Sequence, residues 1–374
     1  MILFKANRDF LLRPLQMVSG IVEKRHTLPI LSNVLIQKEN GKTIFVTTDS
    51  EIEIGIHSQE HENSATELSY PAITVSAKKL LDILRTFPTD FEVTLIKSDS
   101  RLLINAGKSR FSLQMLPAED FPRMAIEDQP EITVNLTQNV LKNLLNLVQY
   151  AMAQQDIRYY FNGLLLVVED RELKVITSDG HRLAYASVEL ENQYSKRETI
   201  IPRKTILELS KLLDDSEKPV TIDIFPKKIR FKFSEVTLLS KVIEGKFPSF
   251  NQIVSKTNSK QFRIDRLNFL QGLQRVAVLS DTSDKFRGVR LVVSKNMLSI
   301  ICKNKEQEEA QEELEIEYDQ ETTDISFNIT YLLDVLNNLN NHNVQCAFEN
   351  TDSSTLFSLP DDDHFKYIVM PMRL

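Results

Sequence analysis

The stretch that decides the fold is PAITVSAKKLLDIL, at Pro71–Leu84, because two later stretches follow the same plan. ETIIPRKTILELSKLL occupies Glu198–Leu213, and DISFNITYLLDVL occupies Asp324–Leu336. In each stretch, a short run of the kind found in strands leads directly into a helical pattern of apolar residues. The chain therefore contains an internal repeat, which is best identified before any other feature of the fold is interpreted.

Two independent markers give the same repeat length. Matching leucines in the three stretches, Leu81, Leu207 and Leu333, recur every 126 residues. A Phe-Pro pair also recurs after 126 residues, at Phe121 and again at Phe247. Polar, turn-rich segments lie near the ends of the repeats, as expected for domain boundaries. We expect three domains, at residues 1–128, 129–256 and 257–374.

Each repeat is predicted to hold two helices and about eight strands. The predicted helices are Asn7–Ser19, Ser76–Thr86, Thr137–Ala153, Arg203–Leu213, Asp265–Leu279 and Ile329–Asn341. Pro14 should end or kink the first turn of the first of these helices, because proline lacks an amide proton. Alternating apolar and polar residues predict the strands, for example two separate strands at Leu164–Val168 and Leu173–Thr177. The expected class is α+β, with helices on one side of antiparallel sheets.

Composition excludes several classes of protein. The 374 residues have an ordinary apolar fraction of 42%, and no stretch approaches the ~18–20 apolar residues of a membrane span. The N-terminus lacks the apolar core of a signal peptide. The two cysteines, Cys302 and Cys346, have no metal-site spacing and fit a reducing cytoplasm. No glycine-rich nucleotide loop and no metal-spaced histidine pair is present, and we expect neither cofactor nor metal.

Positive charge is concentrated on the predicted helices. They hold eleven Lys or Arg and five Asp or Glu, a net charge of +6 in a chain of net charge −7. Glu208 is their only glutamate, although glutamate favours helices as much as lysine does. These basic faces could simply be solvated. The alternative is that they meet a polyanion through phosphate contacts, which carry no base specificity.

Several motifs together resemble the bacterial DNA polymerase III β-subunit family, the sliding clamps. They are TLPILSN at Thr27–Asn33, SRFSL at Ser109–Leu113, QDIRYYFNG at Gln155–Gly163, TSDGHRLA at Thr177–Ala184, KFRGVRL at Lys285–Leu291 and VMPMRL at Val369–Leu374. The resemblance implies a non-catalytic head-to-tail homodimer that forms a closed ring around duplex DNA. It also implies partners that bind through short peptides: the polymerase III α subunit, the clamp loader, other polymerases and repair proteins.

The TSDGHRLA segment has three possible interpretations. Asp179 and His181 could be an acid–base pair, or His181 could be an ordinary turn residue. The resemblance instead implies one wall of a groove for partner peptides. The residues carried over to that groove are Arg158, Tyr160, Phe161, Ser178, Gly180, His181, Arg182, Leu183, Pro248, Ile253, Val369, Met370, Pro371, Met372, Arg373 and Leu374. Gln252 and Phe161 depart from the residues that are common in the family.

The resemblance implies two further surfaces. Residues carried over to a DNA-binding surface are Arg25, Lys78, Lys79, Arg85, Gln155, Tyr159, Lys204, Phe286 and Arg287. Residues carried over to the dimer joint are Lys79, Lys108, Arg110, Phe111 and Leu113 on one side, and Val278, Leu279, Glu306, Glu308, Glu309 and Glu312 on the other. A head-to-tail joint needs two such different patches.

Two other functions compete with the clamp. One is a hydrolase that uses Asp179 and His181, which lacks both a nucleophile elbow and a metal-binding histidine pair. The other is a monomeric repeat scaffold that binds only proteins. The clamp is favoured because its motifs run in one order along the whole chain.

Overall fold

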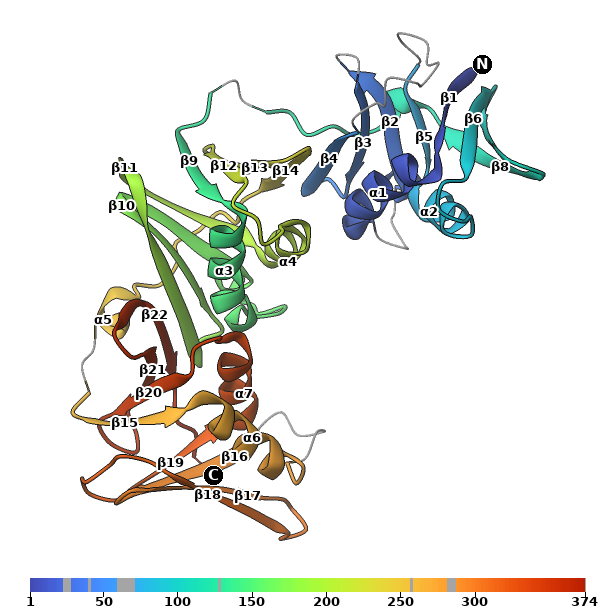
Figure 1. Cartoon of the computed structure of the whole chain (residues 1–374). Coiled ribbons are helices and arrows are strands. Elements are labelled where there is room, and N and C mark those ends of the chain that lie inside the picture. Colours follow the sequence, from blue (N-terminus) through green and yellow to red (C-terminus); the bar gives the residue numbers. More distant parts are fainter. Residues whose placement is uncertain are drawn as a thin grey trace. The chain divides into compact units, whose positions relative to one another are not determined.

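A computed structural model describes residues 1–22, 28–39, 42–58, 71–126, 129–255, 258–280 and 287–373 (Figure 1). The chain forms two compact units. The first is Met1–Leu141 with Leu207–Val242, and the second is Lys142–Ile206 with Ile243–Leu374. Every strand pairing in the described ranges is antiparallel, so the predicted α+β class is confirmed. In the same ranges, the helices fall short of the length and hydropathy of a membrane-spanning segment.

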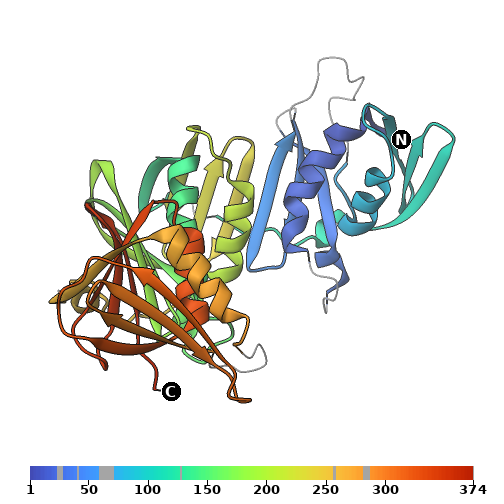
Figure 2. The same cartoon turned by 60° about the horizontal axis from the view of Figure 1, so that its bottom comes forward.

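All six predicted helices are present. The helices are α1 (Arg8–Val18), α2 (Ala77–Arg85), α3 (Gln138–Val148), α4 (Arg203–Leu212), α5 (Asn251–Val254), α6 (Arg266–Ala277) and α7 (Ile329–Asn338). Side-chain oxygens of Asn7, Ser76, Asp265 and Asn328 cap four helix starts by accepting backbone amide bonds. In the first unit α1 packs on α2, and in the second α6 packs on α7 (Figure 2).

Two helix predictions need correction. We expected Pro14 to end or kink the first turn, and the helix does not end there, because α1 continues for four residues beyond Pro14. Pro14 is buried, and a proline removes only one intrahelical bond, so packing of the helix face holds the turn together. The helix predicted to reach Ala153 ends at Val148 and continues as the short 3₁₀ helix η4 (Gln149–Ala151).

The first unit is built on one sheet of twelve strands. Their order across the sheet is β1 (Ile2–Asn7), β6 (Glu92–Ser98), β7 (Arg101–Ala106), β8 (Ser109–Leu116), β5 (Ile73–Ser76), β2 (Asn33–Glu39), β3 (Lys42–Thr48), β4 (Ile52–Ser58), β14 (Val236–Lys241), β13 (Lys228–Phe233), β12 (Pro219–Ile224) and β9 (Ile132–Thr137). Strand β4 of the first repeat pairs with β14 of the middle repeat over five residue pairs, from Ile52 opposite Ser240 to Ile56 opposite Val236.

The second unit contains two sheets. The six-stranded sheet runs β10 (Gly163–Ser178), β11 (Arg182–Pro202), β22 (Asp362–Val369), β21 (Thr355–Leu359), β20 (Asn343–Phe348) and β15 (Lys260–Asp265). The four-stranded sheet runs β18 (Glu309–Glu315), β17 (Met297–Lys303), β16 (Gly288–Ser294) and β19 (Thr323–Asn328). Strand β11 of the middle repeat pairs with β22 of the third, again over five residue pairs.

The prediction of about eight strands per repeat is wrong for the middle repeat, which has β9 to β14. The two strands predicted at Leu164–Val168 and Leu173–Thr177 belong to one element, β10. Its pairing with β11 is irregular between Val168 and Glu172, where Asp170 has a positive φ of 52°. The alternating pattern therefore located the paired segments correctly but not the continuity of the strand.

The first two repeats share their tertiary contacts as well as their sequence. The Thr47 hydroxyl donates to the Val18 carbonyl at the end of α1, and the Thr177 hydroxyl donates to the Val148 carbonyl at the end of α3. In both turns that follow these threonines, an aspartate carboxylate accepts bonds from the amides two and three residues later. These aspartates are Asp49, between β3 and β4, and Asp179, between β10 and β11. The repeat is thus structural and not merely a similarity of pattern.

Candidate functional site

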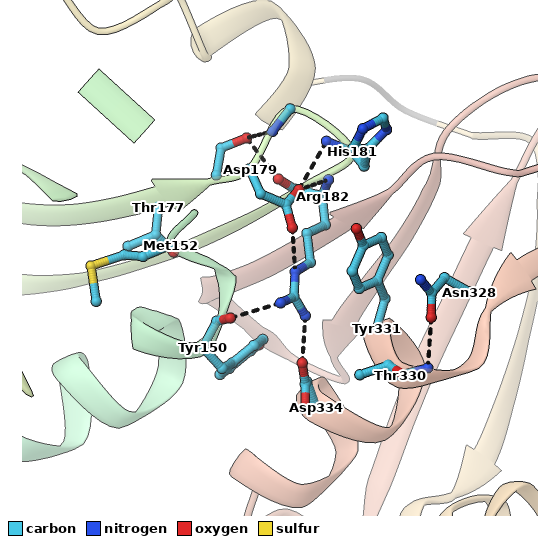
Figure 3. A network of polar contacts seen from close by, with 12 residues as sticks. Tyr150, Met152, Thr177, Asp179, His181, Arg182, Asn328, Thr330, Tyr331 and Asp334 are labelled. Atoms are coloured by element: carbon cyan, nitrogen blue, oxygen red, sulfur yellow. Dashed lines mark hydrogen bonds and ion pairs between the residues drawn. The ribbon is translucent and has the colours of Figure 1, made fainter. Parts of the chain in front are cut away.

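The turn that joins β10 to β11 is fixed by Arg182, the first residue of β11. Its guanidinium donates to Asp179 Oδ2 at 3.0 Å, to Asp334 Oδ2 at 2.7 Å and to the carbonyl oxygen of Tyr150 at 2.8 Å (Figure 3). Only 9% of this side chain is exposed. Asp334 lies on α7 and Tyr150 in η4, so a single side chain connects the turn to two other elements.

Aromatic rings surround this guanidinium. It lies 4.3 Å from the centre of the Tyr331 ring and 5.8 Å from that of Tyr150, within the range of cation–π attraction. The hydroxyl of Tyr367 donates to the Tyr331 carbonyl at 2.9 Å. Burial raises the pKa of both Tyr150 and Tyr367 well above the ordinary value, so both phenols stay protonated. The positive charge of Arg182 is therefore balanced by aspartates and not by tyrosinate.

A second arginine, Arg158, holds the other side of the turn. It donates to both carboxylate oxygens of Asp156, at 3.0 and 2.8 Å, and to the carbonyl of Asp179 at 3.0 Å. Hydrogen bonds from Arg158 lower the pKa of Asp156 to about 2. Gly180, at φ +90°, lets Arg158 approach, since a Cβ there would lie 2.6 Å from its guanidinium. The segment that carries Arg158 is thus fastened to the turn.

An apolar surface lies beside these polar contacts. Its floor is a buried cluster that includes Phe161, Leu183, Phe247 and Ile368. The partly buried side chains packed on this cluster are Tyr160, Ile243, Phe250, Val254 and Leu356. Two apolar residues are more exposed, Ile253 at 43% and Met370 at 51%. Exposed apolar surface of this kind, bordered by polar residues, is typical of a protein-binding site.

The tail after β22 is held by backbone bonds on two sides. The Met370 amide donates to the His181 carbonyl at 2.8 Å, and the Met372 amide donates to the Ser326 carbonyl at 2.8 Å. Val369 is fully buried and pairs with Arg182 in the sheet. The tail therefore follows a defined path past the turn.

The structure brings most of the predicted groove residues together, in different roles. Phe161 and Leu183 form the buried floor, while Arg158, Pro248, Ile253 and Met370 are exposed. The turn itself is held by internal contacts. The Ser178 hydroxyl donates to the Arg182 carbonyl and accepts from the Gly180 amide, and Arg182 pairs with Asp179. Val369 lies beneath the surface, and Leu374 lies outside the described residues. The Asp179 carboxylate accepts hydrogen bonds from two backbone amides and from Arg182. Asp179 is therefore engaged with these groups and does not form an acid–base pair with the His181 ring.

Sequence reasoning missed six residues of this site: Tyr150, Asp156, Phe247, Phe250, Tyr331 and Asp334. A signal existed for Phe247, because it marks the repeat together with Phe121. For Asp334 the contact spans 152 residues, and no local pattern reveals it.

The residues predicted to bind DNA are distributed over both units. Lys78, Lys79 and Arg85 are exposed on α2, Lys204 is half-buried on α4, and Gln155 is exposed with φ +56°. Tyr159 is 55% exposed and rests on Gly245. Arg287 is half-buried and donates two bonds to the Ser280 hydroxyl, at 2.9 and 2.6 Å. Arg25 and Phe286 lie outside the described residues.

The residues predicted for the dimer joint lie in two places. Lys108, Arg110, Phe111 and Leu113 lie in or next to β8, where the Phe111 ring meets Phe87 edge-on at 6.0 Å. Val278 is 81% exposed at the end of α6, with Leu279 half-buried beside it. Three of the glutamates already have partners within the chain: Glu308 bonds Asn304, Glu309 pairs with Lys303, and Glu312 pairs with Arg275.

Comparison with known proteins covers the whole chain. Three family models match the chain. The DNA polymerase III beta subunit N-terminal domain matches residues 2–125, the central domain matches residues 135–249, and the C-terminal domain matches residues 251–373. The chain belongs to the DNA polymerase III beta subunit family, the beta sliding clamps. It is thus a non-catalytic processivity subunit of DNA replication, and DNA and polymerases are its classes of partner.

Individual relatives agree with this assignment. The beta sliding clamp of Pseudomonas putida is 40% identical over 99% of this chain and 100% of its own. That of Escherichia coli K12 is 39% identical over the same shares. The crystal structure of the Pseudomonas aeruginosa beta subunit superposes with a TM-score of 0.92 at 38% identity and full coverage of both chains. The described residues gather no group of three or more potential metal ligands.

Proposed function

We propose that two copies of this chain join head to tail into a closed ring around duplex DNA, and that partner proteins dock in a groove formed over the apolar surface described above. The polymerase III α subunit, the clamp loader, other polymerases and repair proteins would share this groove. The observation that carries the proposal is the apolar surface over Phe161 and Leu183, bordered by the tail at Met370. A cytoplasmic site of action, at the nucleoid, follows from this role.

The chemistry of the groove supports peptide binding. Its aromatic, leucine and methionine side chains can repack around different peptides. Two bulky peptide side chains would gain roughly 1.5–3 kcal/mol each on burial, which suits exchangeable, micromolar binding. Among relatives, a Pseudomonas aeruginosa clamp was solved bound to griselimycin. A Caulobacter crescentus clamp was solved with polyethylene glycol in its putative beta-motif tethering region.

The distribution of charge supports non-specific DNA contact. Lys78, Lys79 and Arg85 present exposed cations on one helix, and the rest of the chain is acidic overall. Contacts to phosphate release counterions without reading bases, so the clamp can slide. We also propose that the three repeats are three clamp domains, at residues 1–128, 129–256 and 257–374, since the tertiary bonds at Thr47 recur at Thr177.

A truncation tests the groove. Because Val369 is a buried strand residue, the deletion should begin at Met370 and remove only the tail. We expect a fluorescent partner peptide, titrated against full-length and truncated protein, to lose most of its affinity on truncation. The dimer mass should stay constant. Unchanged affinity would remove the tail from the site, and a fall to monomer would show that the tail is structural.

A second experiment tests the ring. Protein loaded on nicked circular DNA should be retained and should slide off after the DNA is linearised. Equal retention on linear DNA would contradict encirclement. It would favour simple surface binding.

A further inference from the structure

We infer that Asp334 is a positioning residue for the groove, acting through Arg182 on the turn and on the tail. This inference rests on the proposed peptide-binding function. Asp334 lies on α7 in the third repeat, whereas Arg182 and the turn belong to the middle repeat. The site is therefore assembled from two repeats, and the 2.7 Å ion pair between Arg182 and Asp334 joins their side chains (Figure 3).

The connection passes from Asp334 to the groove in two steps. Asp334 fixes the guanidinium of Arg182, which also donates to the Tyr150 carbonyl and to Asp179. Arg182 follows His181 directly, and the His181 carbonyl accepts the amide of Met370. A change in the position of Arg182 therefore moves the acceptor that directs the tail past the apolar floor.

Among the residues that the structure describes, no neighbouring acceptor can replace the Asp334 carboxylate as the partner of the Arg182 guanidinium. Asp179 already accepts from Arg182 through Oδ2, and its Oδ1 holds the two backbone amides of the turn, so it has no free oxygen to replace Asp334. Removal of one partner from a mostly buried ion pair leaves the other charge poorly compensated. Arg182, at 9% exposure, would have to move toward water or toward another acceptor. Either movement changes the turn.

The repeat provides a natural comparison. Glu208 lies 126 residues before Asp334, and Ile52 lies 130 residues before Arg182. At the junction of the first two repeats, the amide of Lys241 donates to the Glu51 carbonyl at 2.9 Å, as that of Met370 does to His181. That junction keeps the same strand pairing with an isoleucine in place of the arginine. The Arg182–Asp334 pair is therefore not required to join two repeats, which leaves the groove as its role.

Four variants of the full-length dimer test the inference. Asp334→Asn removes the charge, Asp334→Glu keeps a carboxylate, and Glu208→Gln is the matched control, whose carboxylate pairs with Lys211. Arg182→Ala completes a double-mutant cycle with Asp334→Asn. The readouts are peptide affinity by fluorescence anisotropy, dimer mass, and hydrogen exchange at the amide of Met370.

We expect Asp334→Asn to weaken peptide binding about tenfold and to speed exchange at Met370, with the dimer intact. Asp334→Glu should recover most of the affinity, and Glu208→Gln should match the native protein. In the Arg182→Ala background, Asp334→Asn should have no further effect. Unchanged affinity and exchange in Asp334→Asn, or an additive loss in the Arg182→Ala background, would overturn the inference.

Hydrogen exchange at the Met370 amide distinguishes a failure of the proposed peptide binding from a failure of the positioning role of Asp334. If the native protein binds no peptide, the proposed function fails, yet faster exchange at Met370 in Asp334→Asn still supports the positioning role. If the native protein binds peptide and Asp334→Asn lowers only the melting temperature, the residue is merely structural and the inference is wrong.

Discussion

At the scale of single residues, the two arginines of the turn differ in how they act. Arg158 is exposed and bridges surface groups, whereas Arg182, with only 9% of its side chain exposed, connects elements. The TSDGHRLA motif predicted that both would border a groove, but it could not show this difference. Burial of Arg182 depends on Tyr150, Tyr331 and Asp334, which come from distant parts of the sequence.

The Asp156–Arg158 pair predicts a pH dependence. Because the folded pKa of Asp156, about 2, lies below the ordinary aspartate value, the pair stabilises the loop above about pH 4. That contribution is lost as the pH falls toward 2. A carbon NMR titration should give a pKa of about 2 for Asp156 in the native protein and a higher pKa in Arg158→Gln, which keeps only the backbone amide bond of residue 158. Arg171→Gln, which removes a distant surface arginine, should leave the titration of Asp156 unchanged.

Gly180 predicts a local loss of stability. In Gly180→Ala, the positive φ costs about 1–2 kcal/mol, and the new methyl group displaces Arg158. The amides of His181 and Arg182 should then exchange about tenfold faster. Gly55→Ala is the control, since its Cβ would meet Val46 at an ordinary 3.8 Å. Equal exchange rates in the two variants would contradict this account.

At the scale of elements, the sequence predicted the helices better than the strands. Apolar spacing and capping residues such as Ser76 and Asp265 mark helix starts locally, so all six helices were found. The unity of β10 was not predictable, because the irregularity at Asp170 looks like a turn in sequence. The joining of β4 to β14 and of β11 to β22 was also missed, since register between distant strands leaves no local pattern.

The recurrent threonine bonds predict equal effects in two repeats. Thr47 and Thr177 are both fully buried, and each hydroxyl satisfies a carbonyl at a helix end. Thr47→Val and Thr177→Val should each cost about 1–2 kcal/mol, seen as lower urea midpoints and faster exchange at the ends of α1 and α3. Thr237→Val, at a half-buried position of β14, is the control. A large effect of one substitution and none of the other would contradict the structural equivalence.

At the scale of the whole molecule, the dimer joint should depend on apolar contact more than on charge. Glu309 and Glu312 already pair within the chain, and exposed ion pairs contribute only ~0–1 kcal/mol each. Val278→Ala with Leu279→Ala should therefore yield monomers in sedimentation at low concentration, while added salt should weaken the dimer modestly. Leu267→Ala, another exposed position on α6, should remain dimeric. A dimeric double variant would show that the joint lies elsewhere.

The affinity of the clamp for DNA should depend on the charge of its helices and not on the base sequence. Replacing Lys78 and Arg85 by alanine should weaken clamp–DNA binding equally on all sequences and reduce the salt slope by about two. Arg171→Ala is the control for loss of an unrelated surface charge. A strong preference for particular base sequences would contradict a contact limited to phosphates.

Two strand pairings join the middle repeat to its neighbours, β4 with β14 and β11 with β22, and each seam of five residue pairs has a mechanical consequence. Under a pulling force, a seam of backbone hydrogen bonds resists as a row of bonds that must shear together. The joint between subunits in the proposed ring would depend on side chains such as Val278 and Leu279, whose contacts can separate a few at a time. In a force-extension experiment on the closed ring, the first rupture should thus occur between the two chains. A loader that stretches the ring would open it there while each chain keeps its sheets whole.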